Sequence, residues 1–152
     1  MAVVPDRRWR RLQISNGCLK RILEELEMKK VIHTGLPEFG RPTEHATMGG
    51  GHLRTTAVPL KSDGTFETGG VRDQIELAIL NLKKTVAAAG GVMADLLQTL
   101  VFLTSADHVP ILNEVWTKYF EAPYPNRGII IVNAIGVPGI VILIQAHAYI
   151  GE

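Results

Sequence analysis

The stretch GIVILIQAHAY, residues Gly139–Tyr149, decides the fold because its side chains alternate strictly along one expected strand. One face carries only apolar residues, and it continues one residue beyond the stretch: Ile140, Ile142, Ile144, Ala146, Ala148 and Ile150. The opposite face mixes large apolar and polar groups: Val141, Leu143, Gln145, His147 and Tyr149. We expect the first face to lie under helices and the second to be buried against another subunit. The alternation therefore predicts an oligomer.

Two amphipathic helices are expected before this strand. Between Val71 and Ala89 apolar residues recur at steps of four, three and four, and Gly90 and Gly91 then end the helix: Ile75, Ile79, Leu82 and Val86. Ser105 and Asp107 offer N-caps to a second helix, which Pro123 and Pro125 terminate. Its apolar face is Leu112, Val115, Trp116, Tyr119 and Phe120.

The remaining strands complete a two-layer α+β domain. We expect strands at Val31–Thr34 (an edge strand), His52–Leu60, Leu97–Thr104 and Gly128–Ala134, the last joined to the closing strand by a short Gly-Val-Pro-Gly turn. The segment Pro37–Gly51, rich in Gly, Pro and Thr, is expected to be a loop. Strands backed on one side by two helices make the two layers.

Composition indicates one domain. The chain has 152 residues, 46% of them hydrophobic, and sixteen basic against fifteen acidic residues, so no overall charge favours a nucleic-acid or membrane partner. Apolar runs such as Ile140–Ile144 are too short to span a bilayer. Cys18 is the single cysteine, which excludes an intrachain disulfide and favours a cytoplasmic protein.

The N-terminal segment differs in charge from the rest. Residues 1–30 carry eight Lys/Arg and four Asp/Glu, a net +4. Arg7, Arg8, Arg10 and Arg11 fit a nucleic-acid arm, the start of a transit peptide or a solvated extension. Residues 16–28 have helical spacing of apolar groups, and Met28 resembles a natural start. We therefore expect an N-terminal extension, 1–27, before a domain at 28–152.

Several motifs between Val71 and Tyr149 resemble the Rid (YjgF-like) enamine/imine deaminase family. They are Ala-Ala-Gly-Gly at the end of the first helix, then Gln-Thr-Leu-Val-Phe-Leu-Thr, Leu-Asn-Glu-Val-Trp-Thr-Lys-Tyr-Phe, Pro-Tyr-Pro-Asn-Arg and the closing Ile-Gln-Ala-His-Ala-Tyr-Ile. The resemblance implies a chorismate-mutase-like fold with a mixed sheet and a homotrimer with active sites between subunits. It also implies hydrolysis of 2-aminoacrylate-type or 2-aminomuconate-type substrates to 2-oxo acids and ammonia, without metal or organic cofactor.

The resemblance also implies site residues. Arg127 matches the family's substrate-binding arginine, and a guanidinium suits a carboxylate because it binds bidentately and keeps its charge. Asn113 matches an asparagine that lines the cleft from the neighbouring subunit. Thr43 falls, with a one-residue gap, where the family has a tyrosine over the substrate.

Three departures from the family concern catalysis. The family's closing strand reads Glu-Ile-Glu-Ala, and its first glutamate orients the hydrolytic water. Leu143 stands in place of that glutamate here, and Gln145 replaces the second one. The Ser-Gly-Gln before the second strand's proline is changed to Thr55, Thr56 and Ala57. These changes predict a carboxylate site whose hydrolytic machinery is impaired or rebuilt.

Histidines are the candidates for taking over the role of the missing catalytic acid. His52, which opens the second long strand, is the preferred catalytic candidate, with Arg54 two residues on along the same face as a second carboxylate ligand. His147 lies too far along its strand to replace the acid at 143. Glu44 and His45 lie close to His52 in sequence, but their spacing matches no strong metal signature.

Two other functions stay open beside the deaminase. The loss of the acid at Leu143 favours a non-catalytic trimer that binds small carboxylates through Arg127. A ribonuclease or RNA-binding protein ranks below it, because only the basic N-terminal segment supports one.

Overall fold

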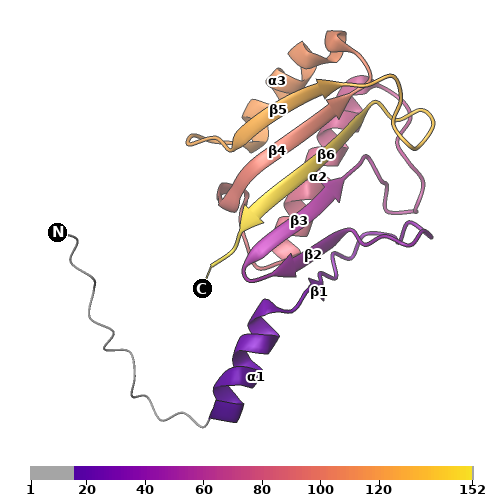
Figure 1. The fold of residues 1–152 in the computed structure, drawn as a ribbon. Helices are drawn as coiled ribbons and strands as arrows, with labels where there is room; N and C mark the ends of the chain where they lie inside the picture. The colour runs from indigo at the N-terminus through magenta and orange to yellow at the C-terminus, as the bar shows by residue number, and fades with distance from the viewer. Residues whose placement is uncertain (1–15, 152) are drawn as a thin grey trace, which may run out of the picture.

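A computed structural model describes residues 16–151. The four arginines of the proposed N-terminal arm, Arg7 to Arg11, lie outside the described residues. Helix α1 (Asn16–Glu27) begins the described chain and ends one residue before the expected helical segment does. Figure 1 shows it standing apart from the sheet, beyond β1.

The sheet of the described chain has six strands in the order β1-β2-β3-β6-β4-β5 (Figure 1). They are β1 (Lys30–Val31), β2 (Ala46–Gly49), β3 (His52–Ala57), β4 (Leu96–Leu103), β5 (Asn126–Ile131) and β6 (Ile142–Tyr149). The β4–β5 pair is parallel and the others are antiparallel. This arrangement confirms the mixed sheet.

Two helices cover one face of this sheet, as expected. Helix α2 (Val71–Ala88) packs on β3 and β6, and α3 (Val109–Tyr119) packs beside α2. The short 3-10 helices η1 (Met93–Asp95) and η2 (Ala106–His108) precede β4 and α3. Ser105 caps η2, because its Oγ accepts a hydrogen bond from the backbone N–H of Asp107 at 3.1 Å. The two-layer α+β prediction is confirmed.

The periodic apolar residues form the core. All four periodic residues of α2 are fully buried: Ile75, Ile79, Leu82 and Val86. On α3, Leu112, Val115 and Trp116 are buried, and Phe120 stacks on Trp116 with ring centroids 3.8 Å apart. Strand β6 alternates between buried and accessible residues along its whole length, as the sequence predicted.

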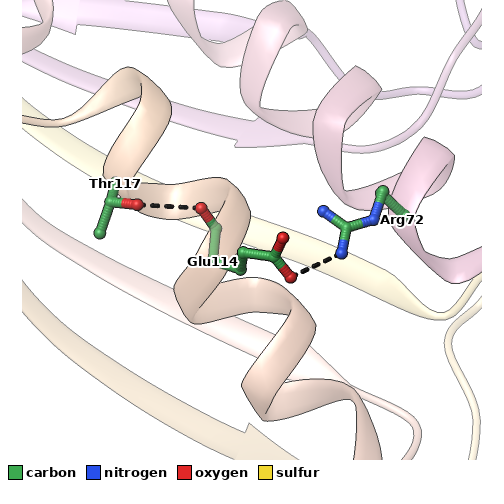
Figure 2. Close-up of polar contacts among 3 residues, drawn as sticks. All are labelled: Arg72, Glu114 and Thr117. Carbon is green, nitrogen blue, oxygen red and sulfur yellow. Dashed lines mark hydrogen bonds and ion pairs between the residues drawn. The ribbon is translucent and has the colours of Figure 1, made fainter.

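An exposed ion pair links the two helices on their outer surface. Arg72 Nη2 on α2 donates to Glu114 Oε2 on α3 at 2.6 Å, and Thr117 Oγ1 donates to the backbone carbonyl of Glu114 at 2.9 Å (Figure 2). The hydrogen bond from Arg72 lowers the pKa of the Glu114 carboxyl. Because both side chains are exposed, water screens the pair, and it adds little to stability.

Several boundaries differ from the sequence expectation. The expected loop Pro37–Gly51 contains β2, which pairs with both β1 and β3. Strand β2 has only four residues, Ala46–Gly49, and so shows no alternating pattern that distinguishes it from the surrounding Gly, Pro and Thr. Strand β1 is shorter and earlier than Val31–Thr34, and β3 ends at Ala57 rather than Leu60. Strand β5 begins at Asn126, so Arg127 lies inside it, and residues 132–141 form a longer connection than a tight turn.

No helix among residues 16–151 is long and apolar enough to cross a membrane.

Candidate functional site

The residues singled out in the sequence gather at two places on opposite sides of the sheet. Arg127 pairs in register with Thr99, which is fully buried on the helix-covered face, so the Arg127 side chain lies on that side. Arg54 pairs with His147 and lies on the open face, the face without helices. Within one chain, the two arginines therefore cannot bind the same small molecule.

The first place is a corner formed by β5 and α3. Arg127 Nη2 donates to Asn113 Oδ1 at 2.6 Å, and the guanidinium carbon lies 4.7 Å from the centroid of the Trp116 ring. Asn113 and Trp116 are three residues apart on one helix and so share a face. The hydrogen bond therefore joins Asn113 to Arg127 of its own chain.

The charge of this corner is not neutralised within the described chain. Arg127 forms no ion pair with a described acid, and its Nη1 is buried without a hydrogen-bond partner there. The buried hydroxyl of Thr99, its neighbour in register, also lacks a partner among these residues. Burial lowers the pKa of Arg127, but a guanidinium stays charged in proteins. An anion that accepts from Nη1 would complete the corner.

The second place is a cavity of about 640 Å³ on the open face. Thr43, Arg54 and Gln145, all predicted to bind substrate, line it from the 42–45 loop, β3 and β6. Lys29 and His147 line it as well. The sequence did not single out Lys29, because a lone lysine beside an expected edge strand carries no motif.

His52 lies beside this cavity rather than in its wall. Its Nδ1 is 2.9 Å from Nε2 of His147, and its ring centroid is 5.1 Å from that of Tyr149. Burial, Arg54 and His52 together lower the pKa of His147. One of these two ring nitrogens donates the hydrogen bond and the other accepts it. The other loop histidine, His45, is held by a 2.7 Å hydrogen bond between its Nε2 and the carbonyl of Pro37.

Leu143 provides no acid at the position where the resemblance implies one. It pairs in register with Phe102 and packs against the small apolar cluster of Val58, Leu60 and Ile140. Glu44 is the only carboxylate that lines the open-face cavity among the described residues. No group of three or more His, Cys, Asp or Glu side chains that could hold a metal ion occurs in the described part of the chain.

Comparison with known families agrees with this architecture. The sequence model of the family described as Endoribonuclease L-PSP matches residues 48–150. The chain belongs to this family. The match includes Arg54, Asn113, Arg127 and Gln145, whereas Thr43 precedes it.

Relatives connect this family with the resemblance seen in the sequence. The chain is 33% identical to a 2-iminobutanoate/2-iminopropanoate deaminase of Dermatophagoides farinae over 60 residues, which are 40% of this chain and 47% of the mite protein. It is 31% identical over 101 residues to the mitochondrial protein mmf2 of Schizosaccharomyces pombe, covering 66% of this chain and 80% of the yeast protein.

A solved structure shows the same fold. The crystal structure of Escherichia coli TdcF with bound serine superposes with a TM-score of 0.73 at 26% identity, over 80% of this chain and 99% of the bacterial one. The predicted Rid-family membership and fold are confirmed.

Proposed function

We propose that this member of the deaminase family hydrolyses 2-aminoacrylate-type or 2-aminomuconate-type enamines and imines to 2-oxo acids and ammonia. The observation that carries the proposal is the Arg127 corner. A partly buried guanidinium, fixed by Asn113 and Trp116, keeps one buried N–H unpaired and meets no acid among the described residues. A substrate carboxylate supplies the missing acceptor. The names of the relatives point to the same reaction class.

The reaction mainly requires that the substrate be positioned relative to the attacking water. The enamine tautomerises to an imine, and water attacks the imine carbon. A carbon–oxygen bond forms, the carbon–nitrogen bond breaks, and nitrogen leaves as ammonia with the protons that water releases. Arg127 holds the carboxylate so that the imine carbon is fixed relative to the attacking water.

The water needs a base that residue 143 does not provide. His52, linked to His147 on the open face, is the residue that we propose for this role. Thr43, Arg54 and Gln145 line the adjacent cavity as the remaining substrate ligands. Because Arg127 lies on the other side of the sheet, these groups meet one substrate only where a second copy contributes them. We therefore propose that the sites lie between subunits, in the homotrimer that the family resemblance implies.

The direct test is turnover of substrates generated in the assay. Purified protein is mixed with 2-aminoacrylate or 2-aminomuconate formed in situ, and ammonia and 2-oxo acid are followed. Arg127→Ala should lower kcat/KM about 100-fold, since two charge-assisted hydrogen bonds of about 1.5 kcal/mol each are lost. Arg127→Lys keeps the charge but loses bidentate geometry and should recover part of the rate. Arg72→Ala, on the outer helix surface, is the matched control and should match the wild type.

Two further variants test the water-positioning step. Leu143→Glu restores the acid that the family carries, and we expect kcat to rise. His52→Gln should lower kcat while KM changes little, because His52 acts on the water rather than on the carboxylate. Failure to accelerate either substrate over buffer would exclude the deaminase for these compounds.

The alternative is a non-catalytic trimer that binds small carboxylates. Leu143, packed in an apolar cluster with no acid at its position, is the observation that favours it. It predicts that a 2-oxo acid binds in an Arg127-dependent manner while both substrates decay at the buffer rate.

A further inference from the structure

We propose that a cavity beside the second half of helix α2 binds a small apolar carboxylate that carries a hydroxyl group at the end remote from its charge. This α2 cavity has a volume of about 430 Å³ and lies between α2, the 61–63 turn and the 35–37 loop. Small-molecule sites commonly have volumes of this order. None of its described lining residues belongs to the open-face cavity or to the Arg127 corner. The inference therefore does not rest on the proposed deaminase reaction.

The walls of the α2 cavity are largely apolar. Leu77 lines it from α2, Leu60 from the segment after β3, and Leu36 and Pro37 from the facing loop. Leu60 is 2% exposed and belongs to the smaller apolar cluster together with Val58. A hydrocarbon body placed against these side chains is removed from water, which favours its binding.

A single buried polar side chain lines the α2 cavity in the described chain. Asn81 is 6% exposed, and its Nδ2 donates to the backbone carbonyls of Val58 and Leu60, both at 2.9 Å. Because both of these neighbours are acceptors, the nitrogen must face them and the oxygen must face away. Asn81 Oδ1 accepts no hydrogen bond from a described residue, and it is not sealed from solvent. A ligand hydroxyl that donates to Oδ1 would satisfy this acceptor.

Lys84 places a positive charge about one helical turn after this amide. Its Nζ donates to the carbonyl oxygen of Gly35 at 3.4 Å, so the side chain crosses from α2 to the 35–37 loop. An ammonium group has three donors, which leaves two for a ligand carboxylate. No described acid forms an ion pair with Lys84. Lys61 lines the cavity from the turn and adds a second positive charge.

Asp63 offsets part of this positive charge. It is the one carboxylate that lines the α2 cavity among the described residues, against two lysines. The hydroxyl and the backbone N–H of Thr65 donate to Asp63 Oδ1, at 2.6 and 2.8 Å, and these bonds lower the pKa of Asp63. The lysines leave a net positive charge, so the cavity favours an anion. Because an ionised Asp63 repels that anion, removing its charge should strengthen binding.

The order of these groups defines the ligand. Asn81 is buried whereas Lys84 is exposed, so a bound ligand directs its hydroxyl inward and its carboxylate outward. Its hydrocarbon body then lies against the leucine and proline walls. The compound 4-hydroxyphenylacetate has a hydroxyl and a carboxylate at opposite ends of a rigid apolar ring, and it is therefore the probe.

Calorimetric titration of the full chain measures binding of this probe. Because Arg54 and Arg127 also attract carboxylates, the titration uses a parent variant that combines Arg54→Gln with Arg127→Ala, beside the wild type. We expect this parent variant to bind 4-hydroxyphenylacetate. Phenylacetate, which lacks the hydroxyl, should bind it at least about fivefold more weakly. The amide 4-hydroxyphenylacetamide, which lacks the charge, should bind at least about tenfold more weakly.

Further substitutions in the parent variant assign the binding to the α2 cavity. Lys84→Gln should weaken binding about tenfold, and Lys84→Arg, which keeps the charge, should recover part of it. Lys83→Gln is the matched control, since Lys83 is exposed on α2 outside the cavity lining, and it should bind as the parent does. Asp63→Asn keeps the acceptor for Thr65 and should strengthen binding about twofold. Urea unfolding of each variant verifies the fold.

Three results would overturn the inference. The first is that the parent variant does not bind 4-hydroxyphenylacetate. The second is equal affinity for this probe and for phenylacetate, because Asn81 would then accept no hydroxyl. The third is binding that Lys84→Gln leaves intact. Turnover by the proposed deaminase depends on Arg127 and binding in the α2 cavity depends on Lys84, so the two proposals fail separately.

Discussion

The two faces of strand β6 differ although they share one backbone. On the helix-covered face Ile142, Ile144 and Ala148 are fully buried, whereas on the open face Gln145 and Tyr149 are exposed and His147 is half-buried. Neighbouring residues of a strand thus serve separate purposes. The covered face supplies most of the hydrophobic stabilisation, and the open face carries groups that titrate or bind. Substitutions on the two faces should therefore affect different measurements.

Arg127 is the exception on the covered side. It lies on the edge strand β5, where Asn113 and Trp116 of α3 contact its guanidinium. A charge is tolerated there because the site is only partly buried and because the ring face and the amide oxygen compensate for lost water. The covered face is thus apolar at its centre and polar at this edge.

The largest effect should come from truncating the centre of the covered face. Ile144→Ala removes a side chain with no exposed surface and should lower the free energy of unfolding by about 2–5 kcal/mol. Gln145→Ala, the next residue on the same strand, should change it by about 0.5 kcal/mol or less. Urea unfolding at fixed protein concentration measures both. Equal losses for the two variants would contradict the comparison, because Gln145 would then be as closely packed as Ile144.

A smaller loss should follow from removing the one buried glutamine of the covered side in the described chain. Gln74 Nε2 donates to the carbonyl of Gly139 at 3.1 Å, and its Oε1 accepts from the backbone N–H of Val141 at 2.8 Å. Gln74→Ala leaves these backbone groups unpaired and should cost about 1–3 kcal/mol. Gln98→Ala, an exposed glutamine of the open face, is the matched control. Equal unfolding midpoints for the two variants would show that the 132–141 connection does not depend on Gln74.

Much of this architecture could be predicted from the sequence because it follows from periodicity. Spacing of 3.6 residues gave the buried faces of α2 and α3, and alternation gave the covered face of β6. Strand β2 was missed because a strand of four residues presents too short a pattern. The bounds of β1 were also wrong, because pairing with β2 sets them, and the end of β3 was wrong because its pairing with β6 stops at Ala57.

The sequence could not predict that the site residues divide between the two faces of the sheet. The sequence indicated that Arg127 and Arg54 are ligands, but which face each occupies depends on the register between strands, and residues far apart in the chain set that register. Pairing of His52 with His147 joins positions separated by 95 residues. The absence of an acid at Leu143, by contrast, was readable directly, because it concerns one position in a motif.

The smallest effect is a pH dependence that arises on the open face. Folding lowers the pKa of His147, so the unfolded chain binds more protons once the pH falls below the ordinary histidine value of about 6.5. Stability contributed by His147 is therefore fully present above that pH and is lost as the pH falls through its folded pKa. The lowered pKa values of Asp63 and Glu114 act in the same direction, but only nearer to about pH 4, where carboxylates titrate.

Urea midpoints measured between about pH 8 and about pH 5 should decline in the wild type and decline less in His147→Gln. His33→Gln, an exposed position outside the pair, should keep the wild-type slope. An unchanged slope in His147→Gln would mean that His147 gains or loses protons equally in the folded and unfolded chain.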